Sequence, residues 1–225
     1  MTRATQILLL RHGHSTANAR SILAGRDKTI GLSDRGQSQA NALADHLDGM
    51  KISRVVISPL LRTRQTVAPF LKRHPDLEVI KDPGIIEMEY GQWSGQSLAR
   101  LSKKALWKSI QKNPSSVRFP DGESFLEMLG RSTETVQRLA LPGKTTLFVS
   151  HGDVIKAITA HYLGLHLDQF QRIAIDPASI TSILIHGDQA TVTQTNNTAH
   201  LNEKVVGPTQ NSLGGGSGAK LSGQR

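Results

Sequence analysis

The sequence contains no cysteine among its 225 residues, so disulfide bonds, thiolate nucleophiles and cysteine-based zinc sites are excluded. No H-E-x-x-H pair occurs either. Metal-ligand spacing is also absent among His74, His161, His166, His186 and His200. We therefore expect neither a metal nor a cofactor.

Long apolar runs are missing as well. No segment approaches the roughly 18 consecutive apolar residues that a membrane-spanning helix requires. The first residues lack the basic region, the apolar run and the cleavage site of a signal peptide. We expect a cytoplasmic protein without a membrane partner.

Aromatic residues make up only 4% of the chain, although its formal net charge is +9. Nucleic-acid surfaces combine clustered basic residues with aromatic rings that stack on bases. Here the basic residues are scattered and form no Lys/Arg-rich run. The charge therefore favours a small anionic ligand over a nucleic-acid partner.

Apolar runs and amphipathic segments alternate through most of the chain. Buried strands are predicted at residues 6–10 and 54–57, and further strands at residues 77–80 and 145–149. Helices are predicted at residues 34–48, 98–112, 124–139 and 154–162. Ile180 to Ile185 and Thr191 to Thr195 are predicted strands joined at Gly187-Asp188. This order predicts a three-layer α/β/α sandwich, with a mostly parallel sheet and an antiparallel edge hairpin.

One further helix is predicted after the strand at residues 54–57. Ser58 is expected to cap it, with Pro59 at its first helical position. Since proline lacks a backbone N–H, Pro69 is expected to end or kink this helix soon after Thr66.

The chain is expected to hold a single catalytic domain at residues 1–206. From residue 207 the composition turns to Gly, Ser, Gln and Lys without periodicity. Such a composition is typical of disorder, so residues 207–225 are expected to form a disordered Gly/Ser-rich tail.

Three predicted strands run directly into polar turns. The turns are Arg11-His12-Gly13, Ser58-Pro59-Leu60-Leu61-Arg62 and Ser150-His151-Gly152. Because ligands bind beyond the carboxyl ends of strands in parallel α/β sheets, these turns are expected to converge. Two guanidinium groups and two helix N-termini would favour phosphate there.

These turns resemble the motifs of the histidine phosphatase superfamily, in its phosphoglycerate-mutase-like branch. The resemblance begins at Arg11-His12-Gly13 with Ser15 and Asn18, and it continues through Arg62, Gln65 and Thr66. It then takes in Glu87, the segment Tyr90-Gly91-Gln92-Trp93-Ser94-Gly95 and finally His151. It covers roughly residues 6 to 195 and implies a phosphoglycerate-mutase-like fold.

The resemblance also implies a role for each catalytic residue. His12 would be the nucleophile that forms a phosphohistidine, so it must be neutral, and the adjacent arginines favour that state. Arg11 and Arg62 would hold the oxygens of the transferred group. His151 would donate to the same group and is expected to be at least partly protonated near it.

Glu87 would be the acid that protonates the leaving oxygen. Glu89 lies only two residues away, and a solvated loop carboxylate is an alternative role for Glu87.

Substrate-binding positions implied by the resemblance are Asn18, Gly13, Gly25, Tyr90 and Gly152. Asn18 could instead form a turn, and Gly13 and Gly152 could simply occupy tight turns. The sequence departs from the family pattern at Ser94 and at Ile30-Gly31-Leu32-Ser33, which puts the shape of the substrate entrance in doubt. The segment Phe119-Pro120-Asp121-Gly122-Glu123-Ser124 is expected to be structural.

We expect a phosphomonoester hydrolase that acts on a small phosphorylated metabolite. The main alternative is a phosphomutase, in which the phosphohistidine passes its group to a second hydroxyl. Only 64 residues separate Glu87 from His151, whereas family mutases tend to carry a longer insertion there. A phospholigand-binding module without catalysis is a third possibility, and the sequence leaves monomer and dimer open.

Overall fold

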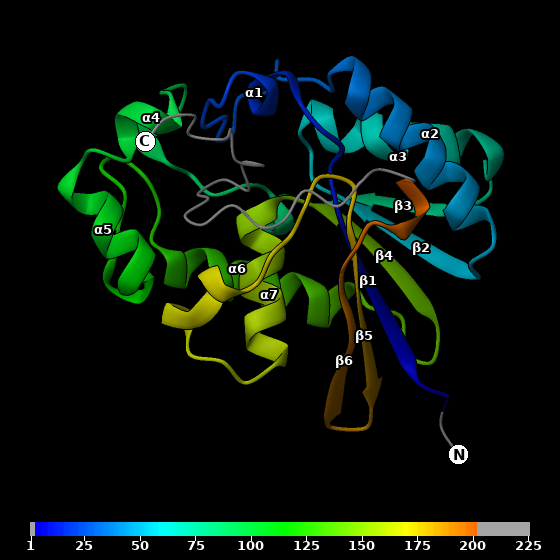
Figure 1. The fold of residues 1–225 in the computed structure, drawn as a ribbon. Helices are drawn as coiled ribbons and strands as arrows, with labels where there is room; N and C mark the ends of the chain where they lie inside the picture. The colour runs from blue at the N-terminus through cyan, green and yellow to red at the C-terminus, as the bar shows by residue number, and fades with distance from the viewer. Residues whose placement is uncertain (1–2, 202–225) are drawn as a thin grey trace.

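The computed structural model describes residues 3–201 of the chain (Figure 1). The tail predicted at residues 207–225 and the end of the predicted domain at residue 206 lie outside the described residues. Within the described part, no helix is long and apolar enough to cross a membrane.

A six-stranded sheet forms the centre of the fold, in the order β3-β2-β4-β1-β5-β6. Its strands are β1 (Thr5–Arg11), β2 (Ile52–Ile57), β3 (Glu78–Lys81), β4 (Thr145–Ser150), β5 (Ile180–His186) and β6 (Gln189–Asn197). The four strands β3, β2, β4 and β1 are parallel, whereas β5 and β6 form an antiparallel hairpin at the edge. The predicted mostly parallel sheet with an antiparallel edge hairpin is confirmed.

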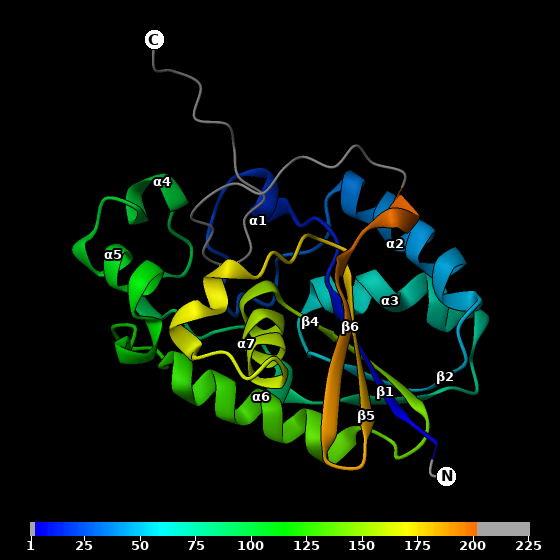
Figure 2. The same cartoon turned by 60° about the horizontal axis from the view of Figure 1, so that its bottom comes forward.

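Helices cover both faces of this sheet, as Figures 1 and 2 show from two directions. The α-helices are α1 (Thr16–Ala19), α2 (Asp34–Asp48), α3 (Leu61–Arg73), α4 (Leu98–Leu101), α5 (Ala105–Lys112), α6 (Phe125–Leu139) and α7 (Gly152–Tyr162). Short 3-10 turns are η1 (Pro83–Ile85), η2 (Gly91–Trp93), η3 (Pro114–Ser116), η4 (Leu167–Arg172) and η5 (Ala199–Leu201).

Successive side chains of β1 point to opposite faces of the sheet, and the core therefore has two layers. Leu8 and Leu10 pack with residues of α2 and α3, such as Leu43 and Phe70. Leu9 faces the other way, into the layer that α6 and α7 cover. Because successive strand side chains point to opposite faces, one fully apolar strand supports both layers. The three-layer sandwich is thereby confirmed.

The predicted cap of α3 is wrong. The helix begins at Leu61, and Leu60 occupies the N-cap position without a side-chain hydrogen bond. A residue before proline is biased toward extended backbone, so the chain continues past Ser58 before it coils. The hydroxyl of Ser58 is directed instead to His151.

Pro69 does not end α3, which continues to Arg73. The turn after Pro69 buries Phe70 in the core, and this packing offsets the hydrogen bond that proline cannot donate.

The helix predicted at residues 98–112 is also wrong as a single element. It is divided into α4 and α5 by residues 102–104, and Lys104 has extended backbone. The Ser102 hydroxyl bonds to the Ala99 carbonyl at 3.0 Å, which offers the backbone a local alternative to helix continuation.

Strand register brings the polar turns together. Arg11 at the end of β1 pairs with Ser150 at the end of β4, and Ile57 at the end of β2 pairs with Val149. All three strands are parallel, so their carboxyl ends meet at one edge of the sheet. The fold therefore places the residues after each strand around one site.

We predict that Leu9→Ala lowers the free energy of unfolding by about 2–5 kcal/mol, because Leu9 is fully buried in a central strand. Urea denaturation monitored by circular dichroism measures this change. Leu126→Ala is the matched control, since Leu126 is 55% exposed on α6, and its effect is expected to be about 0.5 kcal/mol or less. Equal effects of the two substitutions would contradict the assigned core.

Candidate active site

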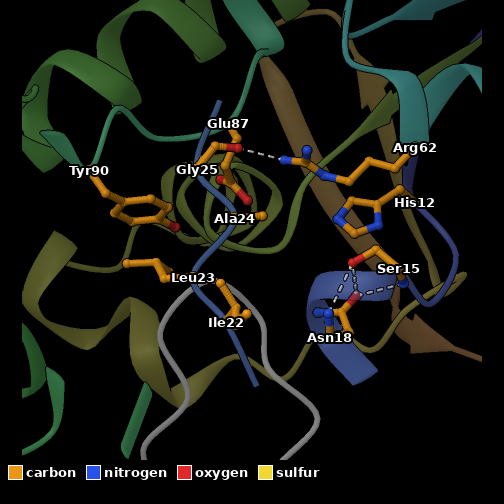
Figure 3. Close-up of a pocket in the computed structure, with 10 residues that line it drawn as sticks. All are labelled: His12, Ser15, Asn18, Ile22, Leu23, Ala24, Gly25, Arg62, Glu87 and Tyr90. Carbon is orange, nitrogen blue, oxygen red and sulfur yellow. Dashed lines mark hydrogen bonds between the residues drawn. The ribbon is translucent and has the colours of Figure 1, made fainter. Parts of the chain in front are cut away.

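A cavity of about 250 Å³, part of it open to solvent, lies at the carboxyl edge of the sheet. Figure 3 shows His12 and Arg62 on one side of it, with Tyr90 and Leu23 opposite. Its lining is formed by His12, Ser15, Asn18, Ile22, Leu23, Ala24, Gly25, Arg62, Glu87 and Tyr90. These residues come from segments that are far apart in the sequence, as the predicted convergence requires.

His12 follows β1 and is only 3% exposed. Its Nδ1 lies 2.7 Å from the carbonyl oxygen of Gly13, which can only accept, so the proton resides on Nδ1. Burial, followed by the charges of Arg62 and Arg11, holds the pKa of His12 well below its usual value. The ring is therefore neutral and carries its lone pair on Nε2.

Two buried guanidinium groups lie near this ring. Arg62 donates to the carbonyl oxygens of Gly25 at 2.8 Å and Asp27 at 3.3 Å, while Arg11 donates to that of Ile175 at 2.7 Å. Among the described residues, no acceptor meets Nε and Nη2 of Arg11 or Nε of Arg62. Burial lowers the pKa of Arg11 to about 10, because the charged guanidinium group loses its hydration.

His151 faces the same site from the turn between β4 and α7. Its ring centroid lies 5.3 Å from that of His12, and its Nε2 lies 2.7 Å from Oγ of Ser58. Its Nδ1 has no hydrogen-bond partner within residues 3–201. Burial and the charge of Arg62 hold the pKa of His151 well below its usual value. The ring is therefore neutral in the free protein. Its protonation beside a bound phosphoryl group stays a prediction.

Glu87 lines the cavity and is 3% exposed. Its Oε1 accepts from the backbone N–H of Met88 at 3.0 Å, and its Oε2 lies 3.9 Å from Nδ1 of His151. Burial, reinforced by the charge of Asp153, raises the pKa of Glu87 to about 7. Glu89 is part of a more exposed ion pair with Arg26, so the structure favours Glu87 as the carboxyl of the site.

Arg131, which no sequence motif singled out, holds the loop that carries Glu87. Arg131 of α6 donates to the carbonyl oxygens of Gly84, Ile86 and Glu87 at 2.7, 2.7 and 3.2 Å. It also forms two hydrogen bonds with the carboxylate of Glu123. The segment 119–124, expected to be structural, therefore helps to fix the loop that carries the acid.

Three of the five predicted substrate positions line the cavity. The side-chain oxygen of Asn18 accepts from Ser15, which leaves its NH2 group as the side available to a ligand. Gly25 has φ of +53°, and a Cβ atom there would approach Oγ of Ser94 at 2.6 Å. Tyr90 donates its hydroxyl to Asp153 at 2.7 Å.

Gly13 and Gly152 are not among the lining residues. The N–H of Gly13 already donates to Oγ1 of Thr66 at 2.9 Å, and its carbonyl orients His12. Gly152 is the first, buried residue of α7. Ligand contact by either glycine stays a prediction. The lining residues that the sequence did not single out are Ile22, Leu23 and Ala24, whose apolar character gave no chemical signal.

The arrangement is chemically suited to an anion. Buried donors without acceptors surround one neutral imidazole, and an anion with several oxygens would satisfy them together. In the part of the chain that the structure describes, no three or more His, Asp or Glu residues form a group that could hold a metal ion.

The sequence profile of the histidine phosphatase superfamily (branch 1) matches residues 7–198. Phosphoserine phosphatase 1 of Hydrogenobacter thermophilus is 29% identical over 208 residues, which cover 89% of this chain and 96% of that protein. A probable phosphoglycerate mutase of Erwinia tasmaniensis is 29% identical over 182 residues, which cover 79% of this chain and 84% of that protein.

Solved structures share the fold. A mycobacterial glucosyl-3-phosphoglycerate phosphatase, in a complex with VO3, has a TM-score of 0.77 at 26% identity, over 85% of this chain and 98% of its own. Bacillus stearothermophilus YhfR has a TM-score of 0.80 at 23% identity, over 88% of this chain and 99% of its own. The fold that the sequence resemblance implied is confirmed.

We predict that Glu87→Gln gains stability relative to the wild type as the pH rises from about 4.5 to 7. In that range the unfolded carboxyl ionises, whereas the folded one keeps its proton because its pKa is raised to about 7. The free energy of unfolding of the wild type therefore falls over this range, whereas that of Glu87→Gln does not. The difference between the two proteins becomes constant above about pH 7. Urea denaturation at a series of pH values measures it.

Glu134→Gln, which replaces an exposed carboxylate on α6, is the control. Its difference from the wild type is expected to stay within about 0.5 kcal/mol across the same range. A Glu87→Gln curve that runs parallel to the wild-type curve would contradict the raised pKa.

Proposed function

Because the chain belongs to branch 1 of the histidine phosphatase superfamily, we propose that it hydrolyses small phosphomonoesters through a phosphohistidine at His12. The observation that carries this proposal is the set of unpaired buried donors around the Nε2 lone pair of His12. A tetrahedral phosphoryl group presents oxygens to these donors while its phosphorus faces the nucleophile.

In the first step, Nε2 of His12 forms a bond to phosphorus as the bond to the ester oxygen breaks. The leaving oxygen takes the proton of Glu87, whose raised pKa of about 7 keeps a large fraction protonated near neutrality. Arg11, Arg62 and His151 hold the oxygens of the transferred group, where charge is concentrated in a loose transition state.

In the second step, water attacks the phosphohistidine. The Glu87 carboxylate takes a proton from this water as the new bond to phosphorus forms, and the bond to Nε2 breaks. Phosphate leaves, His12 regains its lone pair and Glu87 is again protonated. No metal enters either step, since the guanidinium groups already offset the charge of the phosphate.

The substrate that we propose is a small phosphorylated metabolite of the cytoplasm. The cavity wall at Ile22, Leu23 and Ala24 is apolar, whereas His12, Arg62 and Glu87 supply its polar groups. The similarity to a phosphoserine phosphatase supports hydrolysis, whereas the similarity to a probable phosphoglycerate mutase keeps phosphoryl rearrangement as the second candidate.

One assay separates the two candidates. The enzyme is incubated with a panel of phosphomonoesters, including phosphorylated sugar acids with a second hydroxyl, and the products are followed by 31P NMR. Free phosphate as the main product supports hydrolysis, and a rearranged ester without phosphate release would replace it by the mutase.

We predict that His12→Ala lowers kcat by about 10⁴-fold or more, because the covalent route is lost. Brief incubation of the wild type with a 32P-labelled substrate is expected to leave an acid-labile label that is absent from His12→Ala. His186→Ala, on the exposed end of β5, is the control and is expected to keep both activity and label. An active His12→Ala variant would remove the phosphohistidine from the mechanism.

A further inference from the structure

The hydroxyl of Ser58 contacts only one ring in the described part of the chain, that of His151. Oγ of Ser58 lies 2.7 Å from Nε2 of His151, and both residues are fully buried. They are separated by 93 positions in the sequence and meet because the ends of β2 and β4 are neighbours in the sheet. This contact has no part in the two proposed steps.

The backbone holds Ser58 firmly in place for this contact. Its N–H donates to the carbonyl oxygen of Val149 at 3.0 Å, which extends the pairing of β2 and β4 by one residue. Its own carbonyl accepts from Oγ1 of Thr63 at 2.7 Å. Since α3 begins only at Leu61, the hydroxyl is not used as a helix cap.

The direction of the hydrogen bond follows from what each atom can do. Within residues 3–201, Nε2 of His151 is the one acceptor within reach of the Ser58 hydroxyl. If Nε2 carried the proton instead, the hydroxyl hydrogen would be buried without an acceptor, which costs about 1–3 kcal/mol.

We propose that Ser58 is a positioning residue that fixes His151 as the tautomer with its proton on Nδ1. In this tautomer the N–H of a neutral ring lies on the side of Glu87, a residue that lines the cavity, and its hydrogen has no acceptor among residues 3–201. A phosphoryl oxygen bound in the cavity would accept it. His151 thereby donates without carrying a charge beside Arg11 and Arg62. The link to catalysis rests on the proposed function, whereas the tautomer itself does not.

Nitrogen-15 NMR of the full-length, histidine-labelled protein tests the tautomer without any substrate. Long-range 15N–1H correlations distinguish the protonated from the unprotonated ring nitrogen, and the His151 signals are identified by their loss in His151→Gln. We predict a proton on Nδ1 in the wild type and a shift of the His151 signals toward the other tautomer in Ser58→Ala. A proton on Nε2 in the wild type would overturn the proposal.

Kinetics supply the second readout. Ser58→Ala is expected to lower kcat by about 10-fold or more with little change in KM, because a donor to the transition state is no longer fixed. Ser58→Thr, which keeps the hydroxyl, is expected to restore most of the tautomer and of kcat.

Ser150→Ala is the matched control, since it removes a buried hydroxyl next to His151 that donates to the Ile85 carbonyl at 2.8 Å. An equal loss of kcat in Ser150→Ala, or a Ser58→Ala variant with wild-type tautomer and kcat, would overturn the role of Ser58. If the wild type has the predicted tautomer but hydrolyses no phosphomonoester, the proposed function is contradicted. The tautomer proposal then still stands.

Discussion

The buried hydrogen-bond donors at one edge of the sheet are the constraint on which the site depends. Four buried nitrogen atoms of the site have no hydrogen-bond partner among residues 3–201. They are Nε and Nη2 of Arg11, Nε of Arg62 and Nδ1 of His151. A buried donor without a partner costs about 1–3 kcal/mol, and more when it is charged, so an anion with several oxygens would bind favourably to these groups. The same burial and the same charges keep His12 neutral, with its lone pair available. In the proposed mechanism, anion binding and the nucleophilicity of His12 therefore share one physical cause.

The sheet and the layers packed on it hold these donor groups in place. The in-register ends of β1, β2 and β4 fix the three turns, and apolar layers on both faces of the sheet hold the strands. Arg131 holds the loop of Glu87 through three of the loop's backbone carbonyls. A frame of this kind keeps donors pointed at one place even when no ligand balances their charge.

The sequence predicted those parts of the fold that depend on local pattern. The buried strands β1, β2 and β4 and the extents of α2 and α6 follow from hydrophobic periodicity, and the structure contains them. Three features were not predictable in this way: the start of α3, the break between α4 and α5 at residues 102–104, and the hydrogen bond between Ser58 and His151. Each depends on contacts or backbone geometry that only the assembled fold provides, across 93 positions in the last case. The choice between Glu87 and Glu89 likewise required knowing which carboxyl group is buried.

The central claim is that the donors of Arg11, Arg62 and His151 bind one phosphoryl group in front of His12. A crystal structure of the protein with inorganic phosphate tests it most directly. We expect a phosphate within about 3 Å of the unpaired donors, with its phosphorus facing Nε2 of His12. An empty site at saturating phosphate, or a phosphate held only by exposed arginines elsewhere, would contradict it.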